Sequence, residues 1–175
     1  MNSIRFLSFL SLLLICGCPL NSKVPLSNPD PDEFDESLLG LWEYVQKEKD
    51  DEAMLVTVSQ FNKSEYLIVA RQIKKAYDKN EPEELLIRMF LTSIGEARFW
   101  NFQDLEKDLR KREYSFAQYS IEDGKTLHVT MVRNRLFKDH KAATPEALNA
   151  AFKKSIGHKD FLQDKSLIFR RLEEQ

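Results

Sequence analysis

Few residues in this sequence could support redox or metal chemistry. Cys16 and Cys18 are its two cysteines, and they lie one residue apart, directly after an apolar run. A disulfide between residues this close would be strained. A metal site would need further Cys or His ligands, and the next candidate along the chain is His128. These observations argue against both a disulfide and a metal site at the pair.

The remaining candidates for catalysis are scattered. His128, His140 and His158 lie far apart in the sequence and in expected elements of different kinds. The chain has no G-x-S-x-G nucleophile motif, and its five glycines form neither a phosphate loop nor a dinucleotide fingerprint. We therefore expect no catalytic residue, no metal site, no cofactor and no enzymatic activity.

Residues 1–17 have the pattern of an export signal. A short, weakly positive start, Met1 to Arg5, precedes an apolar and serine-containing run from Phe6 to Ile15. As a helix this run would span about 15 Å, half of a hydrocarbon core of about 30 Å. Signal peptides have this length, and we predict one over residues 1–17. The alternative is a buried N-terminal helix, which would have to end in Gly17-Cys18-Pro19 and continue into a proline-rich linker.

The end of this run, Ile15-Cys16-Gly17-Cys18, resembles the lipobox of bacterial lipoproteins. The resemblance implies cleavage between Gly17 and Cys18 and a thioether-linked diacylglycerol on Cys18. Acyl chains add about 0.8 kcal/mol per buried CH₂, so two or more chains anchor a protein stably. The implied partner is membrane lipid, and the implied location is the bacterial cell envelope. In lipoproteins of enteric bacteria, an Asp directly after the modified cysteine favours retention in the inner membrane. Here Pro19 occupies that position, which suggests the outer membrane if the source is Gram-negative.

Composition divides the mature chain into two parts. Residues 18–36 contain Pro25, Pro29 and Pro31 with few apolar residues, and we expect the lipidated cysteine followed by an extended tether. Residues 37–175 then form one domain. Of the 26 Lys and Arg only Arg5 and Lys23 precede it, and of the 28 Asp and Glu five do, which leaves 24 basic against 23 acidic residues. This balance gives no bias toward nucleic acid.

The domain is patterned mainly for antiparallel β-structure. Alternating or β-branched runs predict strands over residues 41–46, 53–61, 65–73, 84–94 and 97–105, a hairpin within 112–137, and a last strand over 165–172. Gly95-Glu96 and Asp123-Gly124 are expected turns. Residues 144–157 predict the single helix, with Thr144 as its cap and Pro145 at its first position. The charged run over 106–114 predicts a solvated connector.

Gly40-Leu41-Trp42 at the start of the first strand resembles the G-x-W that opens lipocalin-like barrels. In that family the Trp packs across the closed end, and an Arg from near the last strand covers it, a position that Arg170 or Arg171 matches. Residues 90–95, "FLTSIG", followed by an aromatic-rich strand, resemble small lipocalin-like bacterial lipoproteins. The resemblance implies one antiparallel lipocalin-like barrel, or a strongly curved sheet, of 7–8 strands with one helix before the last strand. Gly40, Trp42 and the two arginines would then close the barrel.

Two functions follow from these expectations. The barrel could bind a small apolar or amphipathic ligand, which predicts a cavity of about 300 Å³ or more. Alternatively, a filled barrel could serve as a structural or assembly lipoprotein that contacts another envelope protein. Inward-pointing aromatics favour filling, but a one-residue slip exchanges the two faces of a strand, so the sequence leaves the ligand-binding residues open.

Overall fold

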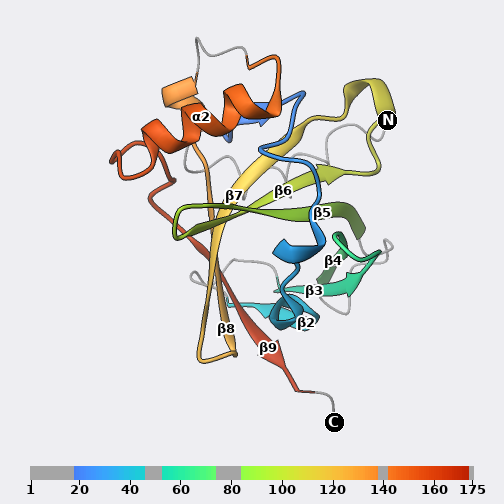
Figure 1. Cartoon of the computed structure of the whole chain (residues 1–175). Helices are drawn as coiled ribbons and strands as arrows, with labels where there is room; N and C mark the ends of the chain where they lie inside the picture. Colours follow the sequence, from blue (N-terminus) through green and yellow to red (C-terminus); the bar gives the residue numbers. More distant parts are fainter. Residues whose placement is uncertain (1–17, 46–52, 74–83, 138–141, 174–175) are drawn as a thin grey trace, which may run out of the picture.

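The computed structural model describes residues 18–45, 53–73, 84–137 and 142–173. Eight antiparallel strands close into a barrel, because β2 pairs with both β3 and β9, and β8 pairs with both β7 and β9 (Figure 1). This confirms the predicted single mainly-β barrel with one helix before the last strand. The barrel strands are β2 (Gly40–Tyr44), β3 (Ala53–Gln60), β4 (Tyr66–Ile73), β5 (Glu84–Ile94), β6 (Ala97–Asp104), β7 (Tyr114–Glu122), β8 (Thr126–Met131) and β9 (Leu167–Leu172).

Two tight turns lie where the sequence predicts them. Gly95 has a φ of 63° between β5 and β6. Asp123 and Gly124 have φ of 51° and 65° and join β7 to β8. Consecutive positive φ angles match the right-handed twist of a hairpin, and Asp and Gly tolerate them best. The expected hairpin between 41–46 and 53–61 has its connection outside the described residues.

Strand alternation separates an interior from an outer face. Leu127, Val129 and Met131 of β8 all point into the barrel, as predicted from their spacing of two, together with Met54 and Val58 of β3. Aromatic and aliphatic side chains from each of the remaining six barrel strands complete this interior cluster. This cluster is the main core of the protein.

A second core lies outside the barrel, under the helix α2 (Pro145–Ser155). Thr144 accepts a hydrogen bond from the backbone N–H of Ala147 and so caps the helix as predicted. Phe152, which is fully buried, packs edge-on against Phe99 of β6 and Phe116 of β7, with ring centroids 5.5 and 5.4 Å apart. The helix therefore covers the outer face of β6 and β7 (Figure 1).

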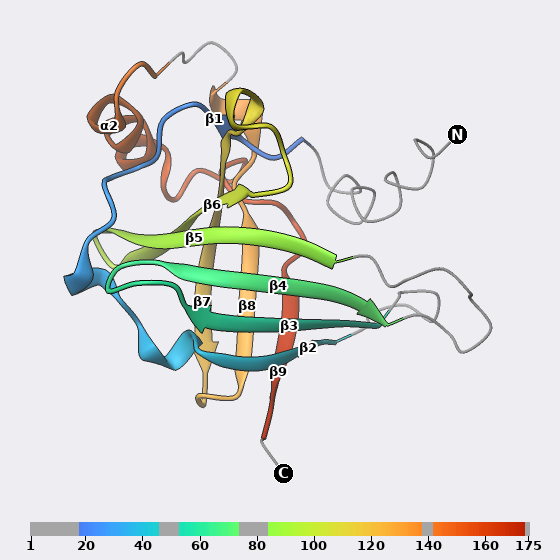
Figure 2. The ribbon, with the colours of Figure 1, turned by 90° about the vertical axis from the view of Figure 1, so that its right-hand side faces the viewer.

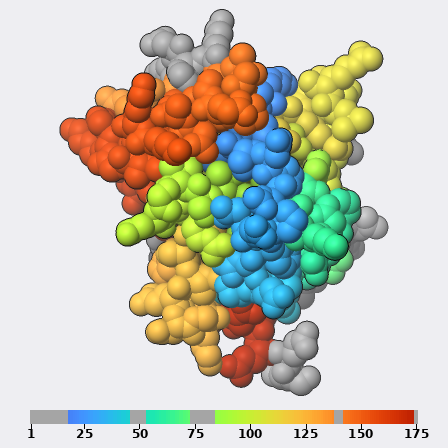
Figure 3. Space-filling view, viewed as in Figure 1, coloured from blue at the N-terminus to red at the C-terminus, as the bar shows by residue number. Residues whose placement is uncertain are grey.

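The N-terminal segment differs from the expected tether. Leu20 and Leu26 are buried in the outer core, and the backbone N–H of Leu26 donates to Asn101 Oδ1 at 2.8 Å. A short strand β1 (Asn21–Ser22) pairs with β7, and two 3₁₀ turns follow, η1 (Pro31–Glu33) and η2 (Glu36–Leu38). Figure 3 shows this segment, in blue, lying across the surface beside α2. The prediction that residues 18–36 extend free of the domain is wrong, because a few spaced leucines and backbone hydrogen bonds suffice to dock a polar, proline-rich chain.

Three further short elements connect the strands: η3 (Leu109–Lys111) between β6 and β7, η4 (Asn134–Phe137) after β8, and an isolated bridge between Val132 and Leu162. Within the described ranges, no helix combines the length and apolar character needed to cross a membrane.

Candidate ligand cavity and barrel closure

Trp42 and Arg171 meet at one end of the barrel. The Trp42 side chain is fully buried, and its Nε1–H donates to the carbonyl of Leu38 at 2.9 Å. The Arg171 guanidinium carbon lies 4.3 Å from the centroid of the indole, a cation–π geometry. Arg171 also donates through Nη1 to the Leu39 carbonyl at 2.7 Å and through Nη2 to the Ser37 carbonyl. One guanidinium thus ties the last strand to η2 and to the start of β2.

Gly40 makes room for this arginine. It has a φ of 127°, which L side chains rarely adopt, and a Cβ built on it would lie 2.9 Å from Arg171 Nη1. Arg170, in contrast, points outward and forms a 3.1 Å ion pair with Glu43 on the exposed surface. Of the two candidate arginines, Arg171 is therefore the one that lies over Trp42.

A polar network seals the same end of the barrel. The Asp35 carboxylate accepts from Arg98 Nη1 at 2.5 Å and from the Tyr119 hydroxyl at 2.9 Å, while the Asp35 backbone N–H donates to the Tyr66 hydroxyl at 2.6 Å. Burial works against the ionised Asp35, but hydrogen bonds from Ser37 and Tyr119 and the charge of Arg98 outweigh it and lower the pKa of this carboxyl. Burial also raises the pKa of Tyr66 to about 12.

The opposite half of the barrel interior is not filled. It contains a cavity of about 130 Å³ between the inward faces of the strands. Its walls include Met54 and Val58 of β3, Ile68 and Ala70 of β4, Leu127 of β8 and Phe169 of β9. Aromatic side chains fill the closed end, where Trp42, Tyr66 and Tyr119 gather. Elsewhere Trp100, Phe102 and Phe169 line the cavity together with aliphatic residues, and the space that remains is smaller than the volume of about 300 Å³ or more expected of a ligand site.

Trp100 is the polar exception in the cavity wall. The side chain lines the cavity, is 9 % exposed and packs against Tyr119 with ring centroids 5.6 Å apart. Its buried Nε1–H has no hydrogen-bond partner among the residues that the structure describes. A buried donor without a partner costs about 1–3 kcal/mol. Because the nitrogen atom is itself buried, it presents no polar contact to the cavity space, and the wall suits an apolar group.

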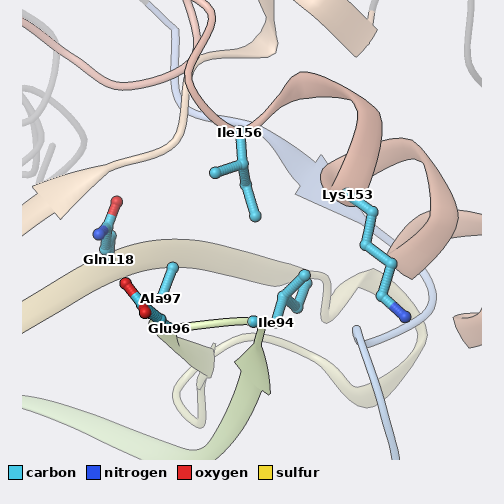
Figure 4. Close-up of a pocket in the computed structure, with 7 residues that line it drawn as sticks. Ile94, Glu96, Ala97, Gln118, Lys153 and Ile156 are labelled. Carbon is cyan, nitrogen blue, oxygen red and sulfur yellow. The ribbon is translucent and has the colours of Figure 1, made fainter.

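A second hollow lies on the surface between α2 and the β5–β6 turn (Figure 4). This hollow is an open groove with a volume of about 710 Å³. Ile94 and Ala97 lie on one side of it, Ile156 lies across from them, and the charged Glu96 and Lys153 lie at its edges. Ile156 is 37 % exposed here. The groove offers neither enclosure nor a buried polar group, so the barrel cavity is the better candidate site.

The other sequence candidates do not converge. His128 lies 3.5 Å from Glu122, and His158 Nδ1 accepts from the backbone N–H of Asp160 in another part of the fold. His140 and Cys16 lie outside the described residues. Over the described ranges, no three His, Cys, Asp or Glu residues are grouped as metal ligands would be. Cys18 has an exposed, free thiol.

In comparisons with known proteins, no family model, no curated protein and no solved structure matches this chain.

Sequence reasoning missed two of the residues that shape this site. Asp35 was assigned to the tether, although it anchors the polar network at the closed end. Trp100 lies in the predicted strand 97–105, but the sequence alone does not show which face of that strand points inward. Alternation along β6 could have paired Trp100 with Phe102, which also lines the cavity.

Proposed function

We propose that this protein is a lipid-anchored lipoprotein of the bacterial envelope whose barrel binds a small apolar or amphipathic ligand. The observation that carries the binding part is the 130 Å³ cavity, which is lined by apolar and aromatic side chains. Apolar cavities of this kind stay dry and accept apolar guests.

The size of the cavity limits the ligand. Pockets for whole drug-sized molecules have about 300–1,000 Å³, whereas a cavity of about 150 Å³ holds a molecule such as benzene. The barrel therefore suits one end of a ligand, an alkyl chain or a single ring. A single-chain lipid, such as a fatty acid, combines an apolar end with acceptor oxygens and is the class that we propose.

The alternative, a structural lipoprotein that contacts another envelope protein, required a filled barrel. The cavity of about 130 Å³ is smaller than the volume of about 300 Å³ or more expected for a whole ligand, but the barrel is not completely filled, which supports binding of one end of a ligand. The closed end supports the same choice, because the bonds of Arg171 and Asp35 stabilise the barrel there without occupying the cavity.

Ligand binding is testable through Trp100. The chain from Cys18 onward would be titrated with ω-bromododecanoate, whose bromine quenches a tryptophan that it contacts. We expect saturable quenching of the wild-type chain. Trp100→Phe should lose most of this quenching, because the remaining Trp42 is buried beneath Arg171 at the closed end.

A filled variant supplies the control. Ala70 is 4 % exposed and lines the cavity, so Ala70→Leu places extra methyl groups inside it and should abolish quenching. Ala150→Leu makes the same change on the exposed face of α2 and should bind as the wild type does. Quenching that is unsaturable, or that survives Ala70→Leu, would argue against a ligand in the barrel.

The anchor needs a separate experiment. Full-length protein expressed in bacteria should carry a diacylglycerol on Cys18 when its N-terminal peptide is analysed by mass spectrometry. Cys18→Ser should move the protein from the membrane fraction to the soluble one. A membrane-bound Cys18→Ser variant without lipid would refute the lipoprotein proposal and leave the ligand proposal standing.

A further inference from the structure

Cys18 is held directly at the barrel, without a spacer. The backbone N–H of Asn134 donates to the Cys18 carbonyl at 3.1 Å, and Pro19 forms a β-bridge with Arg133. Leu20 is buried, and its N–H donates to the Val132 carbonyl at 2.9 Å. A lipid attached to Cys18 would therefore hold this side of the domain close to the bilayer surface.

The connection between β6 and β7, residues 105–113, lies beside the chain that follows Cys18. Lys23 Nζ is 3.3 Å from Glu113 Oε1 and 3.5 Å from the carbonyl oxygens of Arg110 and Arg112. Figure 2 shows β1 next to this connection, drawn in yellow. The segment after Cys18 and the β6–β7 connection thus share one side of the molecule.

The same connection borders the cavity half of the barrel. The Leu105 N–H donates to the Leu86 carbonyl at 2.8 Å, and the neighbours of Leu86, Leu85 and Ile87, line the cavity while remaining half-buried. In Figure 2 this connection lies beside β1 on the upper side of the molecule, away from η1 and η2.

The tip of the connection has the chemistry of a membrane contact. Leu109 is 75 % exposed, the largest value among the exposed large hydrophobic residues of the described chain. Arg110 and Lys111 follow it in η3, and neither side chain has an ion-pair partner among the described residues. An exposed apolar side chain beside two free cations fits the interface of a bilayer that contains anionic lipid.

We propose that η3 docks on the membrane surface and, together with the lipid on Cys18, holds this side of the domain against the bilayer. This inference rests on the proposed lipid anchor. It goes beyond the proposed function, because it gives the domain a second membrane contact and a fixed orientation on the bilayer. The commitment is to a lipid surface; a protein partner at η3 is an outcome of the test.

The test measures which side of the domain touches lipid. A chain that begins at Cys18, and therefore has one cysteine, would be coupled to a maleimide lipid in vesicles of phosphatidylglycerol and phosphatidylethanolamine with brominated acyl chains. Chemical coupling makes the result independent of whether cells acylate Cys18. Two variants would be compared, Leu109→Trp at η3 and Phe61→Trp, at an exposed apolar position just after β3 near the closed end.

Both variants keep the same two native tryptophans, so the difference between them reports the added one. We expect the bromine to quench Leu109→Trp several-fold more than Phe61→Trp. Adding Arg110→Glu and Lys111→Glu to Leu109→Trp should reduce this quenching. Equal quenching at both positions, quenching at neither, or stronger quenching at residue 61 would overturn the proposal and leave η3 to solvent or to a protein partner.

Discussion

The neighbouring arginines of β9 offer a sharp test of how the barrel is closed. Replacing Arg171 with Ala removes the contact with Trp42, the donors to the Leu39 and Ser37 carbonyls and a 3.0 Å hydrogen bond to the Gly124 carbonyl. A cation–π contact on a buried ring contributes about 1–2 kcal/mol. Each hydrogen bond from a charged donor contributes about 1.5–3 kcal/mol in full burial, and less here because the guanidinium is partly exposed.

These contributions are not additive, so we expect Arg171→Ala to lower the free energy of unfolding by about 2–4 kcal/mol. Arg170→Ala makes the same truncation one residue away and removes an exposed ion pair with Glu43, which is worth about 0–1 kcal/mol. For a domain of this size, about 3 kcal/mol corresponds to a fall in Tm of about 6–12 °C.

The measurement is urea unfolding of both variants and the wild type, followed by tryptophan fluorescence and by circular dichroism. Arg171→Lys should recover part of the loss, since it keeps a charge but cannot donate to two carbonyls in a fork. If Arg171→Ala proves no more destabilising than Arg170→Ala, the argument that this arginine closes the barrel fails.

Three further predictions follow from the two cores and the closed end. Ala70→Leu should raise the free energy of unfolding by about 0.5–2 kcal/mol, because it fills the cavity. Ala150→Leu should change the free energy of unfolding by less than about 0.5 kcal/mol. Equal changes in Tm for the two variants would contradict this prediction. Asn101→Leu should lower the free energy of unfolding by about 2–4 kcal/mol and make residues 18–36 more sensitive to limited proteolysis. The fully buried Asn101 amide accepts a hydrogen bond from the Leu26 N–H at 2.8 Å and donates one to Thr92 Oγ1 at 2.9 Å, and the variant loses both. An unchanged cleavage rate would contradict this prediction. Burial raises the pKa of Tyr66 to about 12, so the folded protein keeps the Tyr66 proton to a higher pH than the unfolded chain does. The contribution of Tyr66 to the free energy of unfolding should therefore be fully present below about pH 10 and decrease between about pH 10 and 12. Tyr66→Phe should remove that part of the alkaline loss when the free energy of unfolding is measured against pH.

Much of the fold is readable from local patterns. Alternation with a period of two identified the barrel strands, since each strand has one face in the interior core. The Asp123-Gly124 and Gly95 turns need backbone angles that few other residues adopt, and the Thr144-Pro145 start of α2 depends on neighbours in sequence alone. Such features are local, so a single sequence contains the information for them.

Two features depended on long-range packing. The first is the N-terminal segment. Its composition indicates a free tether, but Leu20 and Leu26 are buried in the outer core. The Leu26 N–H also donates a hydrogen bond to Asn101, which lies 75 residues later in the sequence. Composition cannot report a binding surface that exists only after β6 and α2 have packed together.

The second is the direction in which side chains of a strand point. Arg170 and Arg171 are indistinguishable as neighbours in sequence, and the register of β9 against β2 decides that Phe169 and Arg171 face the interior while Arg170 faces water. The same dependence on register places Trp100 in the cavity wall. The sequence by itself determined the strands, turns and helix, because those follow from neighbouring residues; the closed barrel decided which side chains line its interior and how much space they leave, because one residue of register exchanges the two faces.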